Sequence, residues 1–103
     1  MKIIWSEFAV EMLKDIYEYY KDNVSIKIAK KIKSNILTAT KQLKKHPNSG
    51  QKELLLERLN EGHRYIVEGN YKIIYKHVKK GILITDVFDT RQNPIKMERN
   101  KED

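Results

Sequence analysis

The segment from His63 to Pro94 constrains the fold more than any other part of the chain, because β-forming runs alternate in it with tight turns. Val, Ile, Tyr and Phe dominate three runs, and Gly69-Asn70 and Lys80-Gly81 separate them. A glycine in the first central position of a two-residue loop suits a type II′ hairpin. The pattern therefore predicts an antiparallel meander of three strands.

Two-residue loops would also set which residues of neighbouring strands face each other. The expected pairs are Val67–Lys72, Tyr65–Ile74 and His63–Lys76 in the first hairpin, and Ile74–Val87 and Lys72–Asp89 in the second.

Alternation along these strands predicts one apolar face and one mixed face. The apolar face, expected to be covered, holds Ile66, Ile73, Tyr75, Ile82, Ile84 and Phe88. The mixed face, expected to be open, holds His63, Tyr65, Lys72, Lys76, Asp89 and, just past the last strand, Arg91. A three-residue turn at either place would move part of this assignment to the other face.

The first half of the chain predicts a short strand over residues 2–5 and then two amphipathic helices. Ser6 can cap the first helix, over residues 7–22, and Ser25 the second, which ends by Pro47. The short connection makes the two helices an antiparallel hairpin. Residues 48–62 fit either a helical turn or an edge strand.

The expected fold class is therefore α+β, with an N-terminal strand, a helical hairpin and the meander, and with the helices packed on one sheet face. Residues 1–94 are expected to form a single domain and residues 95–103 a charged tail.

Positive charge is concentrated in one stretch. The net charge is +7, and Val24 to Lys52 contains eight lysines and no acidic residue. Such a stretch attracts phosphate backbones or an acidic protein, although a solvated helix face has the same composition. Lys41, Lys44 and Lys45 are candidates for nucleic-acid contact. The chain has no cysteine and no long apolar run, so we expect a cytoplasmic protein with no membrane role.

The residue pattern offers no metal-ligand spacing and no phosphate-binding glycine loop, so no metal and no cofactor is expected. The mixed sheet face could cleave RNA without a metal. His63 would act as acid or base, while Lys72 and Arg91 would hold the phosphate. Tyr65 would stack on a base, and Lys76 would add a backbone contact.

The segments Gly-Asn-Tyr-Lys-Ile-Ile-Tyr (69–75) and Val-Phe-Asp-Thr-Arg-Gln-Asn-Pro (87–94) resemble the RelE/ParE family of bacterial toxins. The resemblance extends from Ile3 to Pro94. It implies the α+β fold described above. In the RNA-cleaving branch, Lys72 and Arg91 match basic positions and His63 stands where those enzymes have a lysine. Asp89 departs from that pattern, as does the absence of a catalytic Tyr or His after Arg91.

The resemblance implies a toxin of a type II toxin–antitoxin system and leaves three functions open. The first is ribosome-dependent cleavage of mRNA by a metal-independent endoribonuclease. The second is non-enzymatic inhibition of DNA gyrase, as in the ParE branch. The third is an inactive homologue that only binds its antitoxin. In each case the partner is a cognate antitoxin with an acidic C-terminal segment, bound as a helix in a groove or as a strand on a sheet edge.

Overall fold

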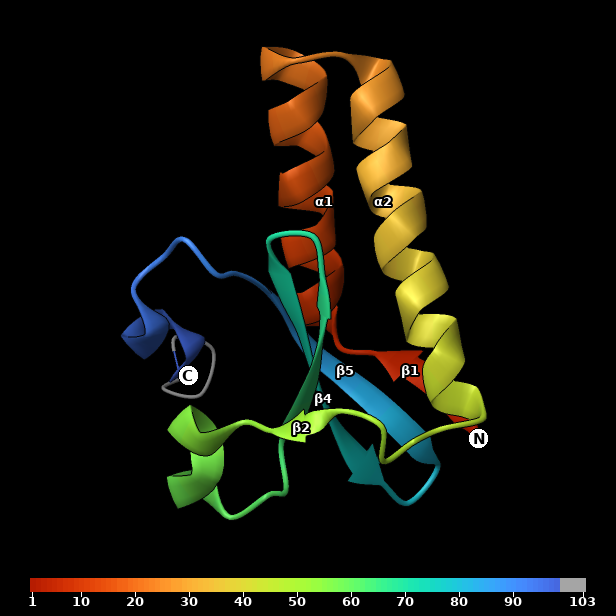
Figure 1. Ribbon diagram of the computed structural model, residues 1–103, viewed down its shortest axis with the longest axis vertical. Helices are drawn as coiled ribbons and strands as arrows, with labels where there is room; N and C mark the ends of the chain where they lie inside the picture. The colour runs from red at the N-terminus through yellow and green to blue at the C-terminus, as the bar shows by residue number, and fades with distance from the viewer. Residues whose placement is uncertain (99–103) are drawn as a thin grey trace.

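The computed structural model describes residues 1–98 and consists of a helical hairpin packed on one face of a mixed sheet (Figure 1). The five strands lie in the order β1-β5-β4-β3-β2. Their bounds are β1 Lys2–Trp5, β2 Gln51–Lys52, β3 Arg64–Glu68, β4 Tyr71–Val78 and β5 Gly81–Asp89. Strand β1 runs parallel to β5, whereas the other neighbours are antiparallel. The α+β class is confirmed, with one strand more than the sequence predicts.

Helices α1 (Glu7–Asn23) and α2 (Ile26–Lys41) begin where the sequence predicts. The Ser6 hydroxyl accepts a hydrogen bond from the Ala9 amide, and the Ser25 hydroxyl accepts one from the Ile28 amide. These caps satisfy amide groups that have no partner within the helix. The hairpin extends well beyond the sheet, so that the turn between the helices lies far from the strands (Figure 1).

The main core lies between the hairpin and the sheet. Ala9 and Leu13 of α1 and Ile36 and Ala39 of α2 pack against apolar side chains of the strands, which include Tyr71, Ile73, Tyr75, Ile82, Ile84 and Val87. The helix residues recur at helical spacing, so each helix buries one face and exposes the other.

The first hairpin of the meander has the predicted register. Val67 pairs with Lys72 and Tyr65 with Ile74, and Gly69 has a φ of +59°. The predicted His63–Lys76 pair lies outside the strand, because β3 begins at Arg64.

The predicted register of the second hairpin is wrong. Its two-residue turn is Lys79-Lys80, since Val78 pairs with Gly81. A bulge opposite Ile74 and Tyr75 then adds one residue to β5 at Thr85, so that Ile74 pairs with Asp86 and Lys72 with Phe88. The bulge moves Phe88 away from the helices and brings Val87 and Asp89 to the helix side.

A second, smaller cluster covers the other sheet face. The ambiguous stretch forms both a short strand, β2, and a 3₁₀ helix, η2 (Leu54–Leu59), while Pro94–Glu98 form a second 3₁₀ helix, η3. Leu56 and Met97 from these helices pack on Ile74 and Phe88. The face expected to be open is therefore partly covered, because Phe88 needs apolar neighbours there.

The loop before β2 is clamped to the sheet by Tyr75. Its buried hydroxyl donates to the Pro47 carbonyl at 3.0 Å and accepts from the Gly50 amide at 3.0 Å. Arg64 donates to the Gly50 carbonyl at 2.8 Å, so this arginine also holds the loop. A further 3₁₀ turn, η1 (Gln42–Lys44), joins α2 to this loop. Within residues 1–98, neither helix has the length and apolar character needed to cross a bilayer.

Candidate functional site

A cleft lies between α1 and the end of β5. Its volume is about 440 Å³. Helix α1 contributes Met12, Asp15, Ile16, Tyr19 and Tyr20, and the sheet side contributes Tyr71, Val87, Asp89, Arg91 and Gln92. The cleft thus combines aromatic walls with both signs of charge, which is the composition of a site for a protein side chain or a small polar ligand.

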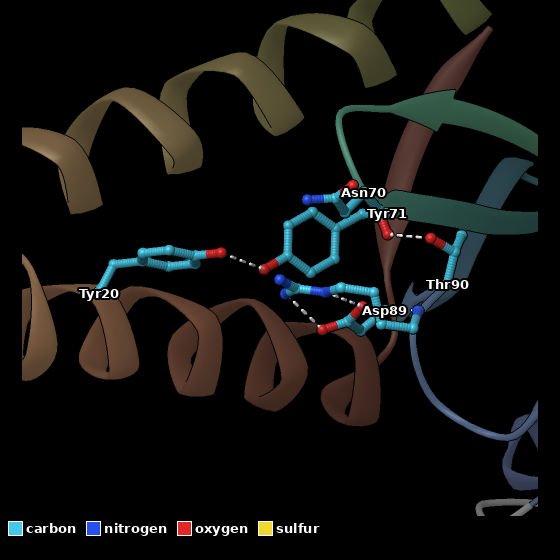
Figure 2. Close-up of polar contacts among 6 residues, drawn as sticks. Tyr20, Asn70, Tyr71, Asp89 and Thr90 are labelled. Carbon is cyan, nitrogen blue, oxygen red and sulfur yellow. Dashed lines mark hydrogen bonds and ion pairs between the residues drawn. The ribbon is translucent and has the colours of Figure 1, made fainter.

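Two tyrosine hydroxyls meet inside this cleft. Tyr71 donates to Tyr20 at 3.4 Å, and Figure 2 shows the Tyr20 side chain pointing from α1 toward Tyr71. Burial raises the pKa of Tyr71, whereas the hydrogen bond from Tyr71 lowers the pKa of Tyr20, with a further lowering by Arg91. Tyr20 is therefore the hydroxyl of the pair that loses its proton first.

The end of β5 is held by a compact set of polar contacts (Figure 2). Arg91 donates to both carboxylate oxygens of Asp89, at 2.9 and 2.8 Å, and its backbone amide donates to the same carboxylate. Thr90 donates from its amide and its hydroxyl to the Asn70 carbonyl, both at 2.8 Å. The Arg91 guanidinium holds the pKa of Asp89 below its usual value. The Asp-Thr-Arg sequence therefore builds a fixed ion pair beside the cleft.

Lys72 lies on the opposite face of the sheet from Arg91. Its ammonium group pairs with the Glu53 carboxylate at 2.9 Å and lies 4.1 Å from the centre of the Tyr65 ring. Glu53 is 3% exposed and also accepts a hydrogen bond from the Leu55 amide. The Lys72 ammonium group is thus neutralised by a buried carboxylate. Lys72 also covers one face of the Tyr65 ring, which was expected to stack on a base.

The other residues predicted to form the site on the Lys72 face of the sheet also contact neighbouring side chains. Lys76 pairs with Glu61 at 2.7 Å, and the His63 Nε2 atom lies 3.8 Å from the same carboxylate. The His63 side chain is fully buried in the loop that precedes β3. The Tyr65 hydroxyl donates to Gln51 at 3.1 Å.

The structure therefore does not bring the predicted catalytic residues together. His63 and Lys72 lie on the face covered by η2, whereas Arg91 lies on the helix side, because the bulge in β5 reverses the direction of the residues after it. Lys41, Lys44 and Lys45 lie at the far end of α2 and the following turn, all exposed. Their role in nucleic-acid contact stays a prediction.

The tyrosine pair is not among the site residues predicted from the sequence, since neither Tyr20 nor Tyr71 was expected to have a functional role. The available signal was the tyrosine-rich end of the first helix, together with the Tyr that follows Gly69-Asn70. Within the described part of the chain, no three His, Cys, Asp or Glu side chains gather closely enough to hold a metal ion.

Comparison with known proteins assigns the chain to a family. A model of the family described as the ParE toxin of the type II toxin–antitoxin system parDE matches residues 3–94. The chain belongs to the ParE toxin family. The predicted resemblance to RelE/ParE toxins is confirmed, and so is the assignment to type II toxin–antitoxin systems.

A solved structure has the same fold as this ParE-family chain. It is described as a chromosomal ParDE toxin–antitoxin system from P. aeruginosa, and one of its chains aligns with a TM-score of 0.72. The alignment covers 86% of this chain and 95% of that chain at 20% sequence identity. The search of curated proteins gave no significant match.

Proposed function

We propose that this ParE-family toxin inhibits growth without cutting RNA, by binding DNA gyrase through its helical hairpin. The observation that carries the proposal is the separation of the three residues suited to RNA cleavage. A phosphate held by Arg91 would lie on the other side of the sheet from Lys72 and His63.

Charge pairing supports the same conclusion. A phosphorane needs cations that are not already neutralised. Lys72 is paired with buried Glu53, and Arg91 is paired through two hydrogen bonds with Asp89. Breaking the pair that involves buried Glu53 would leave a desolvated carboxylate without a cation, which would destabilise the fold.

The hairpin has the surface expected of a protein-binding element. Val24 and Ile26 lie at the connection between α1 and α2 and are 59% and 52% exposed, and Tyr19, in the second half of α1, is 59% exposed. Exposed apolar side chains gain free energy when a partner covers them, so these residues suit a protein interface.

A cognate antitoxin completes the proposal. The family match and the ParDE relative support a partner that neutralises the toxin. A chain of net charge +7 favours an acidic partner segment.

The test uses the purified wild-type toxin in two assays. We expect inhibition of gyrase-driven supercoiling of relaxed plasmid, and no new 5′ ends when translated mRNA is examined by primer extension. Ribosome-dependent cleavage sites would contradict the proposal and restore the alternative function, mRNA cleavage, which the high positive charge favours. No effect in either assay, together with normal growth on induction, would indicate an inactive homologue that only binds its antitoxin.

A further inference from the structure

A second cleft, of about 310 Å³, lies on the hairpin between α1 and α2, away from the tyrosine cleft. Lys30, Lys33 and Lys41 line it together with the hydroxyl-bearing side chains of Tyr17, Ser34 and Thr38. We propose that this lysine cleft binds the phosphate backbone of duplex DNA. The choice of DNA over another polyanion rests on the proposed function, since gyrase works on duplex DNA.

The spacing of these residues suits a linear row of phosphates. Positions 30, 33, 34, 38 and 41 recur at helical spacing, so they share one face of α2. The eleven-residue separation of Lys30 and Lys41 spans about 16 Å along a helix that rises 1.5 Å per residue. One DNA strand places a phosphate about every 3.4 Å of axis, so the cleft can follow roughly five of them.

The charges of this cleft are available to a ligand. Helix α2 contains five lysines and no acidic residue, and within residues 1–98 none of Lys30, Lys33 and Lys41 takes part in an ion pair. This contrasts with Lys72, Lys76 and Arg91, each of which has a carboxylate within 3 Å. Lys30, Lys33 and Lys41 thus differ from the paired cations Lys72, Lys76 and Arg91.

The chemistry of the cleft favours a phosphate backbone over an amphipathic peptide or stacked bases. Serine and threonine hydroxyls beside lysines are usual phosphate contacts. Leu37 is the only aliphatic side chain that lines the cleft, whereas a bound peptide helix needs an apolar groove. Lys33 lies 5.4 Å from the centre of the Tyr17 ring, so this ring is partly covered and offers a poor stacking platform for single strands.

The experiment measures binding of a fluorescent 20-base-pair DNA duplex by anisotropy, with the full chain and without gyrase. The test variant is Lys33→Gln/Lys41→Gln. Its matched control is Lys79→Gln/Lys80→Gln, which removes two exposed charges from the β4–β5 turn. We expect at least a tenfold loss of affinity at low salt for the test variant and less than a threefold loss for the control. The slope of log K against log salt should fall by about two for the test variant, because each phosphate contact releases nearly one counterion.

Equal losses in the two variants would overturn the proposal, because they would show that only net charge matters. Displacement of the DNA by polyglutamate at equal charge, with no effect of Ser34→Ala/Thr38→Ala, would assign the cleft to an acidic protein instead. Binding of an RNA duplex as tight as that of DNA would overturn the assignment to DNA. Because the binding assay contains no gyrase, a lack of DNA binding would not contradict the proposal that the toxin inhibits gyrase. Likewise, a lack of gyrase inhibition would not change the DNA affinities measured here.

Discussion

At the scale of single residues, Glu53 limits what the sheet face can do. This carboxylate is almost fully buried, and Lys72 is the cation that compensates it. Removal of one partner of a buried ion pair leaves an uncompensated charge, which typically costs about 3 kcal/mol or more. Lys72 therefore has a structural role that any catalytic test of this residue must separate from its chemistry.

We predict that Lys72→Ala lowers the free energy of unfolding by about 3 kcal/mol. The double variant Glu53→Gln/Lys72→Gln should recover most of that loss, because it leaves no unpaired buried charge. The glutamine at position 53 can still accept the hydrogen bond of the Leu55 amide. Urea denaturation of the wild type and the two variants measures both values. A Lys72→Ala variant as stable as the wild type would show that the pair contributes nothing.

Asp89 gives a prediction for acid stability. Its pKa is lowered in the folded protein by hydrogen bonds from Arg91, so its stabilising contribution is fully present above the ordinary aspartate value of about 3.9. That contribution is lost as pH falls through the lower pKa of the folded state, because the unfolded chain binds the proton more readily. Between pH 5 and pH 2, Asp89→Asn should therefore lose less stability than the wild type. Parallel stability curves over that range would refute the role of the Asp89–Arg91 pair.

At the scale of elements, the loop before β2 depends on close contact with Tyr75. A Cβ atom on Gly50 would lie 2.5 Å from the Tyr75 hydroxyl oxygen and 2.7 Å from the Tyr65 carbonyl oxygen. Both neighbours are part of the sheet, so neither can move without disturbing the hydrogen bonds that hold the loop.

We predict that Gly50→Ala lowers the free energy of unfolding by about 2 kcal/mol, as overpacking in tight sites does. Ser49→Ala, at the exposed neighbouring position, should change it by less than about 0.5 kcal/mol. Thermal unfolding of the two variants decides the matter. Equal melting temperatures would mean that the loop can move away from Tyr75.

Most elements could be predicted from the sequence, because their signals are local. Ser6 and Ser25 mark helix starts, and Gly69-Asn70 marks a turn that the structure contains with the expected register. The second hairpin differs because its register depends on contacts between distant parts of the chain. Regular alternation after Ile84 would direct Asp86 into the core beneath the helices, and the bulge at Thr85 places Val87 there instead.

That single bulge also explains why the candidate site was predicted only in part. The prediction placed Asp89 and Arg91 beside Lys72, and the bulge moves them to the helix side, where they meet Tyr20 and Tyr71. The signal for a bulge in the sequence was Asp86, a charged residue at a position of the predicted apolar face. This residue does not by itself show where in β5 the extra residue of the bulge lies.

At the scale of the whole molecule, the helical hairpin combines exposed apolar side chains with cations that have no ion-pair partner. Val24 and Ile26 are exposed at its tip, and within residues 1–98 no lysine of α2 takes part in an ion pair, whereas Lys72 and Lys76 on the sheet face are paired. Exposed apolar groups and unpaired cations are the groups with free energy to gain from a partner. We therefore expect the toxin to engage its target with the hairpin.

The most direct measurement is supercoiling of relaxed plasmid by purified DNA gyrase with three forms of the toxin. These are the wild type, the hairpin variant Val24→Ser/Ile26→Ser and the sheet-face variant Glu53→Gln/Lys72→Gln. We predict that the wild type and the sheet-face variant inhibit at similar concentrations, and that the hairpin variant needs at least tenfold more. The proposal is contradicted if the wild type does not inhibit, or if the sheet-face variant alone loses inhibition while it remains folded.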